Sequence, residues 1–395
     1  MSFFDVFKNE AKLVFTDVAI VLTIIGGVIL YSFLYPQPYA KEAVSSLRVS
    51  VVDLDRSDIS RDVIFELNAT PQISVYKVHN SQKDAKDALV EGEVKAIVII
   101  PKHFKKDLAL NKSPTIAVGA DASYFLIYGG VLEGAMRSIL TTSATIKIAN
   151  LLKKQVPLSG AKEAFTPYSL NIINLFNTQN SYTQYVVPAV FVLILQQTML
   201  IGLGILGGGI NERQRDKEQG YFNEAPVWMM IFSRVIIFGC IFLIHMLFYF
   251  GFSFEMFSIT HLAYMGDLLT FGISFLLASL SLGIFLGSLF SSREIATPVI
   301  LFSSLPLVFS AGFVWPLEAV PQFIKQLSML FPSTPAIQGF LKLNQMGCDF
   351  DMVLAHYQTL WIQTVLYFLL SYLVINYNKR KSILKMVQYQ DIDKN

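Results

Sequence analysis

The stretch Val186–Ile210 reads VVPAVFVLILQQTMLIGLGILGGGI and contains no charged residue. A bilayer core about 30 Å thick is crossed by about 20 apolar residues in a helix, so this stretch is long enough to span a membrane. Similar apolar runs occur at Leu13–Leu34, Met229–Phe250, Tyr264–Phe290, Pro298–Val314 and Leu360–Ile375. The sequence therefore predicts an α-helical membrane protein with six transmembrane helices.

The overall composition agrees with a membrane protein. Hydrophobic residues make up 53% of the chain and charged residues only 15%, whereas soluble domains carry about 25% charged residues. The formal net charge is +2, so charge gives no indication of a nucleic-acid partner. The first apolar run is too long for a signal peptide, and we expect it to remain as an uncleaved anchor. We expect no disulfide between the two cysteines, Cys240 in a span and Cys348 in a loop.

The basic residues beside the apolar runs predict the orientation, because Lys and Arg favour the cytoplasmic side. They flank the runs on one side, at Lys8, Lys12, Arg213, Arg215, Lys217, Arg293, Lys379, Arg380, Lys381 and Lys385. The opposite loop 251–263 has none, and 315–357 holds only Lys325 and Lys342. We therefore expect a multi-pass protein of the plasma (bacterial inner) membrane with both termini in the cytoplasm.

This layout predicts the domain boundaries. We expect a cytoplasmic interfacial helix at 1–12, span 1 at 13–35, an extracytoplasmic domain at 36–184, a transmembrane domain at 185–378 and a cytoplasmic tail at 379–395. In the first segment one helical face carries Phe3, Phe4, Phe7 and Ala11, which suits a helix in the membrane interface. A frayed start of span 1 is the alternative.

The polar segment 36–184 is predicted to be an α/β domain. Short β-branched stretches alternate with helical patterns, which is typical of that class. The expected strands are Arg48–Asp53, Ile73–Val78, Ala96–Ile100 and Thr115–Val118. The expected helices are Ile59–Leu67, Asp84–Glu91 and a long one from Asp121 to about Lys154. About 150 residues are enough for a separate core.

The sequence gives no indication of catalysis. It lacks the phosphate loop G-x-x-x-x-G-K-[ST], and it also lacks H-E-x-x-H, G-x-S-x-G and any Cys/His metal spacing. We therefore expect a protein that is not itself an enzyme and that holds no cofactor.

Two segments outside regular spans are unusual. The loop 211–228 is charged and breaks at Gly220 and Pro226. The stretch 315–349 is too apolar for a free loop and too rich in proline for a span. Irregular backbone at membrane depth needs protein or water to satisfy it, so we predict re-entrant outer helices here. A hairpin lying on the surface is the alternative.

Polar and small residues inside the spans also carry information. Gln196, Gln197 and His245 are candidates for a substrate path, because polar groups in a membrane face a bundle interior or a cavity. For His245 we favour a hydrogen bond between helices. Small residues at Ser279, Gly283 and Gly287 allow helices to approach closely, and here we favour packing within the bundle over dimerisation.

Several segments, in this order, resemble the permease subunit of a type-2 ATP-binding-cassette (ABC) exporter with a large extracytoplasmic domain between spans 1 and 2. Their sequences are KNE, VFTD, VSVVDLD, AIVIIPKHF, RDKEQG, GFVWPLEAVP and FPSTP. They lie at Lys8–Glu10, Val14–Asp17, Val49–Asp55, Ala96–Phe104, Arg215–Gly220, Gly312–Pro321 and Phe331–Pro335. The likeness covers nearly the whole chain.

The resemblance implies that 211–228 is a coupling loop seated on a separate ATPase subunit, which would bind ATP and Mg²⁺. Its residues would be Arg215, Glu218, Gly220 and Tyr221. We expect Gly220 to permit a turn that other residues resist. The family usually has threonine where Tyr221 stands. A solvated positive-inside loop is the alternative.

The resemblance also implies an outer gate formed by the re-entrant stretch. Its residues would be Gly312, Trp315, Pro316, Pro321, Pro332 and Pro335.

Together with this resemblance, the sequence predicts a permease half-transporter for a hydrophobic or amphiphilic, drug-like or lipid-like substrate, and the resemblance alone implies that the direction is export. Its partners would be an ABC ATPase, a second copy or a paralogous permease, the lipid bilayer and a periplasmic adaptor, with no nucleic acid. One alternative is a membrane-anchored sensor or assembly factor whose outer domain binds a ligand. Another is an ion-driven secondary transporter, which should show inverted repeats and ionisable residues at the midplane.

Overall fold

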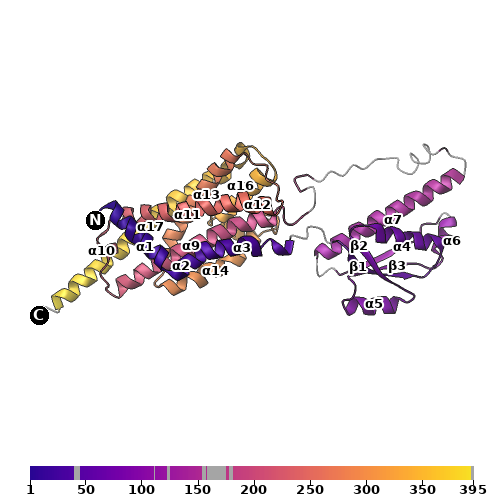
Figure 1. Cartoon of the computed structure of the whole chain (residues 1–395), viewed down its shortest axis with the longest axis horizontal. Helices are drawn as coiled ribbons and strands as arrows, with labels where there is room; N and C mark the ends of the chain where they lie inside the picture. The colour runs from indigo at the N-terminus through magenta and orange to yellow at the C-terminus, as the bar shows by residue number, and fades with distance from the viewer. Residues whose placement is uncertain are drawn as a thin grey trace. The chain divides into compact units, whose positions relative to one another are not determined.

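The computed structural model describes residues 1–39, 45–110, 112–121, 125–153, 157, 175–177 and 181–392. The chain forms two compact units (Figure 1). We call Met1–Ala40 with Asn174–Asn395 the membrane unit, and Lys41–Ile173 the α/β unit.

Among its described residues, the membrane unit contains six helices that are long and apolar enough to cross a bilayer, which confirms the predicted fold class. They are Val18–Tyr39, Val186–Arg215, Val227–Met256, Met265–Leu289, Arg293–Ser310 and Phe350–Leu384. The first span consists of α2 (Val18–Val21), η1 (Leu22–Gly27), α3 (Val28–Leu34) and η2 (Gln37–Tyr39), and the second is α9 (Val186–Arg215). The third consists of α11 (Val227–Leu247), η3 (Phe248–Ser253) and α12 (Phe254–Met256). The fourth is α13 (Met265–Leu289), the fifth is α14 (Arg293–Ser310), and the sixth lies in η5 (Phe350–Val353) and α17 (Leu354–Ile392).

The N-terminal helix α1 (Phe3–Thr16) ends at Asp17. The Asp17 carboxylate accepts hydrogen bonds from the backbone N–H groups of Ala19 and Ile20, at 3.0 and 3.3 Å, and so caps α2. The helix break therefore lies a few residues beyond the 12/13 boundary expected from apolarity, because a helix cap is set by one side chain.

Helix α9 lies at the centre of the membrane unit, packed by α13, α14 and α16 (Ser333–Phe340). Glycines permit this close packing. A Cβ on Gly207 would lie 2.6 Å from the backbone of Gly287, and one on Gly283 would lie 2.6 Å from the Leu203 side chain. Gly283 and Gly287 of α13 thus pack against α9 of the same chain, which confirms the intrachain packing predicted for them.

Helix α14 differs from the other spans. It contains Pro298 and Pro306, and much of its apolar surface is exposed, including Leu301, Phe302 and Leu305. No described residue of the chain covers this surface, so it is available to lipid or to another subunit.

The chain beyond α14 forms two short helices, α15 (Gln322–Ser328) and α16, followed by η4 (Leu341–Gln345). Helix α16 is buried against α9, α13 and α17, whereas α15 exposes Phe323, Ile324 and Leu327. The predicted interruption of the helix by proline is therefore present in this stretch.

The α/β unit has one four-stranded sheet with the order β2-β1-β3-β4. Its strands are β1 (Leu47–Asp53), β2 (Ile73–His79), β3 (Ala96–Ile100) and β4 (Ala117–Ala120). Strand β1 is parallel to β2 and β3, and β4 is antiparallel to β3. The α/β class is thus confirmed, with β4 two residues further along the chain than expected.

In the described part of the unit, four helices accompany this sheet: α4 (Asp58–Ala69), α5 (Gln82–Val90), α6 (Phe104–Ala109) and α7 (Phe125–Lys153). Helices α4 and α7 cover one face of the sheet and α5 the other (Figure 1). Helix α6 was not predicted from the sequence, because six residues are too few to show a helical period.

The VSVVDLD segment has a structural role in this unit. Oδ1 of buried Asp53 accepts from the N–H groups of Asp55 and Arg56, at 3.1 and 2.9 Å, and its Oδ2 accepts from the Ser60 hydroxyl at 2.7 Å. Asp55 in turn accepts from the N–H of Lys105 at 3.0 Å. The two aspartates fix the turn after β1 and the start of α6.

Candidate functional site

The loop 211–228 runs from the last turn of α9 to the start of α11. It is anchored by buried contacts and also exposes charged side chains. Phe222 of α10 (Tyr221–Glu224) is buried, and Lys379 of α17 donates to the carbonyl of Ala225 at 2.6 Å. Several of its charged residues are exposed, namely Arg213, Arg215, Asp216, Lys217, Glu218 and Glu224. A loop that is anchored by buried contacts and exposes charged side chains is suited to docking another protein.

Gly220 has a different role from the one expected. Its φ is −164°, an extended conformation that any residue adopts, so the predicted turn does not require glycine. A Cβ at this position would instead collide with the ring of Phe222. Glycine is needed here because the buried ring lies against the backbone.

An ion pair lies in the interior of the membrane unit between Glu10 of α1 and Arg234 of α11. Arg234 Nη2 donates to Glu10 Oε1 at 3.0 Å, and Arg234 Nε lies 3.2 Å from both carboxylate oxygens. The two side chains are 0% and 4% exposed. An isolated buried charge is very costly, so removal of either residue would leave the charge of the other buried and unpaired.

Tyr221 of α10 lies beside this ion pair. Its buried hydroxyl has no hydrogen-bond partner among the described residues. Burial, together with the negative charge of Glu10, raises the pKa of the phenol, so the group remains neutral at physiological pH. Helices α1, α10 and α11 therefore meet at one polar cluster, which places the loop 211–228 in contact with the N-terminal helix.

Arg234 was not among the predicted site residues. The available signal was a single arginine inside the apolar run Met229–Phe250, since such a residue needs a partner. Its partner, Glu10, belongs to the KNE segment but lies 224 residues away along the chain.

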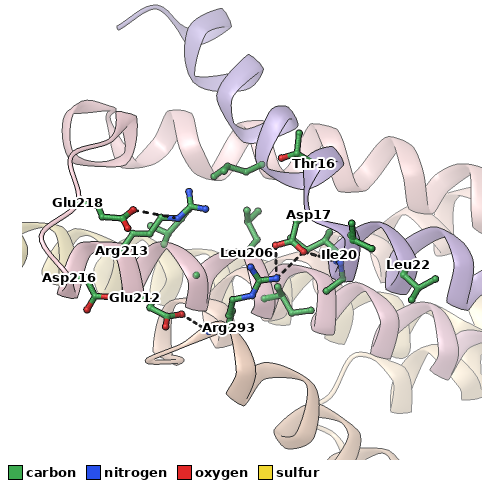
Figure 2. Close-up of a pocket in the computed structure, with 16 residues that line it drawn as sticks. Thr16, Asp17, Ile20, Leu22, Leu206, Glu212, Arg213, Asp216, Glu218 and Arg293 are labelled. Atoms are coloured by element: carbon green, nitrogen blue, oxygen red, sulfur yellow. Dashed lines mark hydrogen bonds and ion pairs between the residues drawn. The ribbon is translucent and has the colours of Figure 1, made fainter.

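A cavity of about 910 Å³ opens beside this region (Figure 2). Its apolar wall comes from α1, α2, η1 and α9, through Leu13, Ile20, Leu22, Ile205, Leu206 and Ile210. Its charged wall includes Asp17, Glu212, Arg213, Asp216, Glu218 and Arg293. Figure 2 shows Arg293 between the carboxylates of Asp17 and Glu212. Arg293 Nη2 lies 2.8 Å from Asp17 Oδ2. The backbone N–H of Arg293 donates to Glu212 Oε2, with 3.4 Å between nitrogen and oxygen.

A second cavity, of about 450 Å³, forms an apolar groove between span 1, α9 and α14. We call it the apolar groove. Its lining is mostly aliphatic and aromatic, with a few hydroxyl and amide groups. The residues are Leu22, Thr23, Gly27, Tyr31, Tyr35, Val190, Leu193, Ile194, Gln197, Thr198, Ile201, Leu301 and Ser304. Sites for apolar small molecules have this composition and size.

The three predicted path residues occupy different surroundings. Gln197 lines the apolar groove and donates to the Ser303 hydroxyl at 3.4 Å. Gln196 faces α16, where it donates to the Ser333 hydroxyl at 3.0 Å and accepts from its N–H at 2.6 Å. His245 packs edge-on against Phe242, and its Nδ1 has no hydrogen-bond partner in the described part of the chain. The hydrogen bond between helices that we expected for His245 is therefore absent at its Nδ1 among the described residues, whereas Gln196 forms such bonds, which we did not predict.

The predicted gate residues lie between α14 and α15 or at the starts of the short helices α15 and α16. Gly312 has φ +91°, a left-handed conformation that favours glycine. Trp315 is exposed, Pro321 and Pro332 immediately precede α15 and α16, and Pro335 lies in the first turn of α16. Pro316 accepts a backbone hydrogen bond from Ala319 at 2.9 Å, which closes a turn.

A comparison with protein families matches residues 18–373 to the family described as ABC-2 family transporter protein. The chain belongs to the ABC-2 transporter family. A comparison with curated proteins finds no match. The chain is therefore a multi-pass ABC-2 permease, a membrane component of a transporter.

Permeases of this family typically work with an ATPase partner and dimerise. In this permease the charged loop, Arg234 and the apolar groove all lie within the matched range, whereas Glu10 precedes it.

Proposed function

We propose that this ABC-2 permease is one half of an exporter that moves a hydrophobic or amphiphilic substrate, drug-like or lipid-like, out of the cytoplasm or inner leaflet. A separate ATPase subunit binds ATP and Mg²⁺ and supplies the energy. A second copy, or a paralogous permease, completes the pathway.

The apolar groove is the observation that carries this proposal. It is bounded by α14, whose exposed apolar surface is not covered by any described residue, and by the well-packed helix α9. Its polar groups are uncharged, so it suits an apolar or amphiphilic molecule better than an ion. The substrate would pass along this groove, with Gln197 as its polar contact.

The charged loop 211–228 is proposed as the site where the ATPase docks. Its anchoring through Phe222 and Lys379 allows a push on the loop to reach α11 and α17 as a rigid-body movement. The ion pair of Glu10 and Arg234 would carry the same movement to α1.

The topology and the gate complete the proposal. Both termini lie in the cytoplasm of an inner-membrane protein, and the α/β unit lies outside, where a periplasmic adaptor can reach it. The stretch 315–349 forms re-entrant helices whose gate closes the outer end of the pathway. The basic residues beside the spans support this orientation.

The proposal is tested with a substitution that narrows the groove and leaves the rest of the permease unchanged. Leu301 lines the groove from α14 and is exposed. In vesicles that contain the permease and its ATPase, Leu301→Trp should abolish transport of a fluorescent amphiphile and its stimulation of ATP hydrolysis.

The matched control is Ile362→Trp, at an exposed apolar position of α17 outside the groove lining. It should retain transport and stimulated hydrolysis. Unchanged transport by Leu301→Trp would refute the groove as the pathway.

A further inference from the structure

The α/β unit contains a cavity of about 480 Å³ that the transport proposal does not use. It lies between α4, α6, the segment leading into β4, and α7. The volume falls within the range of small-molecule sites, about 300–1,000 Å³.

The inner wall of this cavity is apolar. It is formed by side chains from all four elements: Val63, Phe104, Leu108, Pro114, Ile116, Ile139 and Ile146. Val63 and Phe104 belong to the buried core of the unit, with Leu108 and Ile116 packed against it. The cavity is therefore an extension of the hydrophobic core to the surface.

Polar groups are confined to a few positions of the lining. Lys112, Ser113, Ser143 and Lys147 line the cavity together with the buried Thr142. Both lysines are exposed, and no carboxylate is among the described residues of the lining. Asp107, outside the lining, lies 3.8 Å from Lys112 Nζ in an exposed pair, which contributes little.

Helix α7 presents one continuous stripe to the cavity. Its lining residues are Ile139, Thr142, Ser143, Ile146 and Lys147, a spacing of three and four residues that places them on one helical face. The stripe continues the buried positions Val131 and Ala135, which pack in the core. The same helix thus supplies apolar wall, hydroxyl groups and a positive charge.

From this arrangement we infer that the cavity binds a single-chain anionic amphiphile, with its alkyl chain against the isoleucines and its carboxylate or other anionic head at Lys112 and Lys147. A methylene group is close in size to a water molecule, which occupies about 30 Å³ in the liquid, so a cavity of about 480 Å³ holds roughly 16 methylenes. One chain of moderate length fits, and a two-chain lipid does not.

The inference does not depend on the proposed export function, because it concerns a site within the α/β unit. A binding experiment on the whole permease in nanodiscs therefore tests it without a transport readout.

The probe is dodecanoate with a photoreactive diazirine near the end of its chain. Cross-linked peptides identified by mass spectrometry should come from 104–116 and 139–147. Unlabelled dodecanoate should compete, whereas dodecyltrimethylammonium and dodecanol should compete poorly. Cross-links confined to the membrane unit, or equal competition by the cationic or neutral amphiphile, would overturn the inference.

Two sets of variants locate the chain and the head group. Ser143→Trp fills the cavity and should remove the cross-link, whereas Thr145→Trp, exposed and outside the lining, should keep it. The double change Lys112→Glu with Lys147→Glu should weaken binding about tenfold, and Arg137→Glu elsewhere on α7 should not. The charge variants change exposed residues, which keeps the fold. Wild-type binding by both Ser143→Trp and the double charge variant would refute the site.

Discussion

Replacing Glu10 by alanine removes one partner of the ion pair with Arg234. The Arg234 side chain is 4% exposed and makes three contacts of 3.0–3.2 Å with the carboxylate. Glu10→Ala leaves its charge buried without compensation, which costs about 3–5 kcal/mol of unfolding free energy. For a unit of this size, that loss corresponds to a decrease of roughly 6–10 °C in melting temperature.

The assay is thermal unfolding of the whole permease in one detergent. Three variants separate the charge effect from packing: Glu10→Ala, Arg234→Met and the double variant Glu10→Met with Arg234→Met. Both single changes should destabilise the protein. The double change should recover most of the loss, because an apolar pair can replace a buried ion pair at little cost.

The matched control is the exposed pair of Arg213 and Glu218, whose closest N–O distance is 3.9 Å. Glu218→Ala should change the unfolding free energy by less than about 1 kcal/mol. A melting temperature of Glu10→Ala equal to that of wild type, or a double variant that is less stable than either single one, would refute the reasoning.

Three further predictions concern the charged loop and the topology. Glu218→Lys should reduce co-purification of the ATPase in a pull-down while the melting temperature stays unchanged, and full recovery of the ATPase would contradict docking at this loop. Gly220→Val should displace the Phe222 ring and lower stability by about 1–3 kcal/mol in thermal unfolding; wild-type stability would show that the ring has room to move. In a cysteine-free background, a cysteine at Ser57 should react with an impermeant thiol reagent on intact cells and one at Gln214 should not, and the reverse pattern would overturn the orientation.

The six spans and the α/β class could be predicted because they follow from local patterns. An apolar run such as Val186–Ile210 has no soluble alternative of that length, and strand–helix alternation is visible within a few tens of residues. The end of α1 at Asp17 was harder to locate, since a cap depends on the conformation of one residue.

The side-chain contacts of the candidate site could not be predicted in the same way. Glu10 and Arg234 are 224 residues apart, and Asp17 and Arg293 are 276 apart. A sequence shows that a charge in an apolar segment needs a partner, but it does not show which residue the fold brings to it. Gly220 illustrates a further difficulty, because its requirement comes from a ring position and not from its own backbone angles.

The carboxylate of Asp17 links two events that would otherwise be independent. Its Oδ1 accepts from the first N–H groups of α2 and also from Arg293 Nη2 at 3.0 Å, at the start of α14. If α14 moves away from α2, Asp17 loses either its ion pair with Arg293 or its hydrogen bonds to the N–H groups of α2. Loss of the cap costs about 0.5–2 kcal/mol, and this free energy opposes separation of α2 and α14. One end of the 910 Å³ cavity is therefore held by a single carboxylate, whose contacts tie the start of α2 to the start of α14.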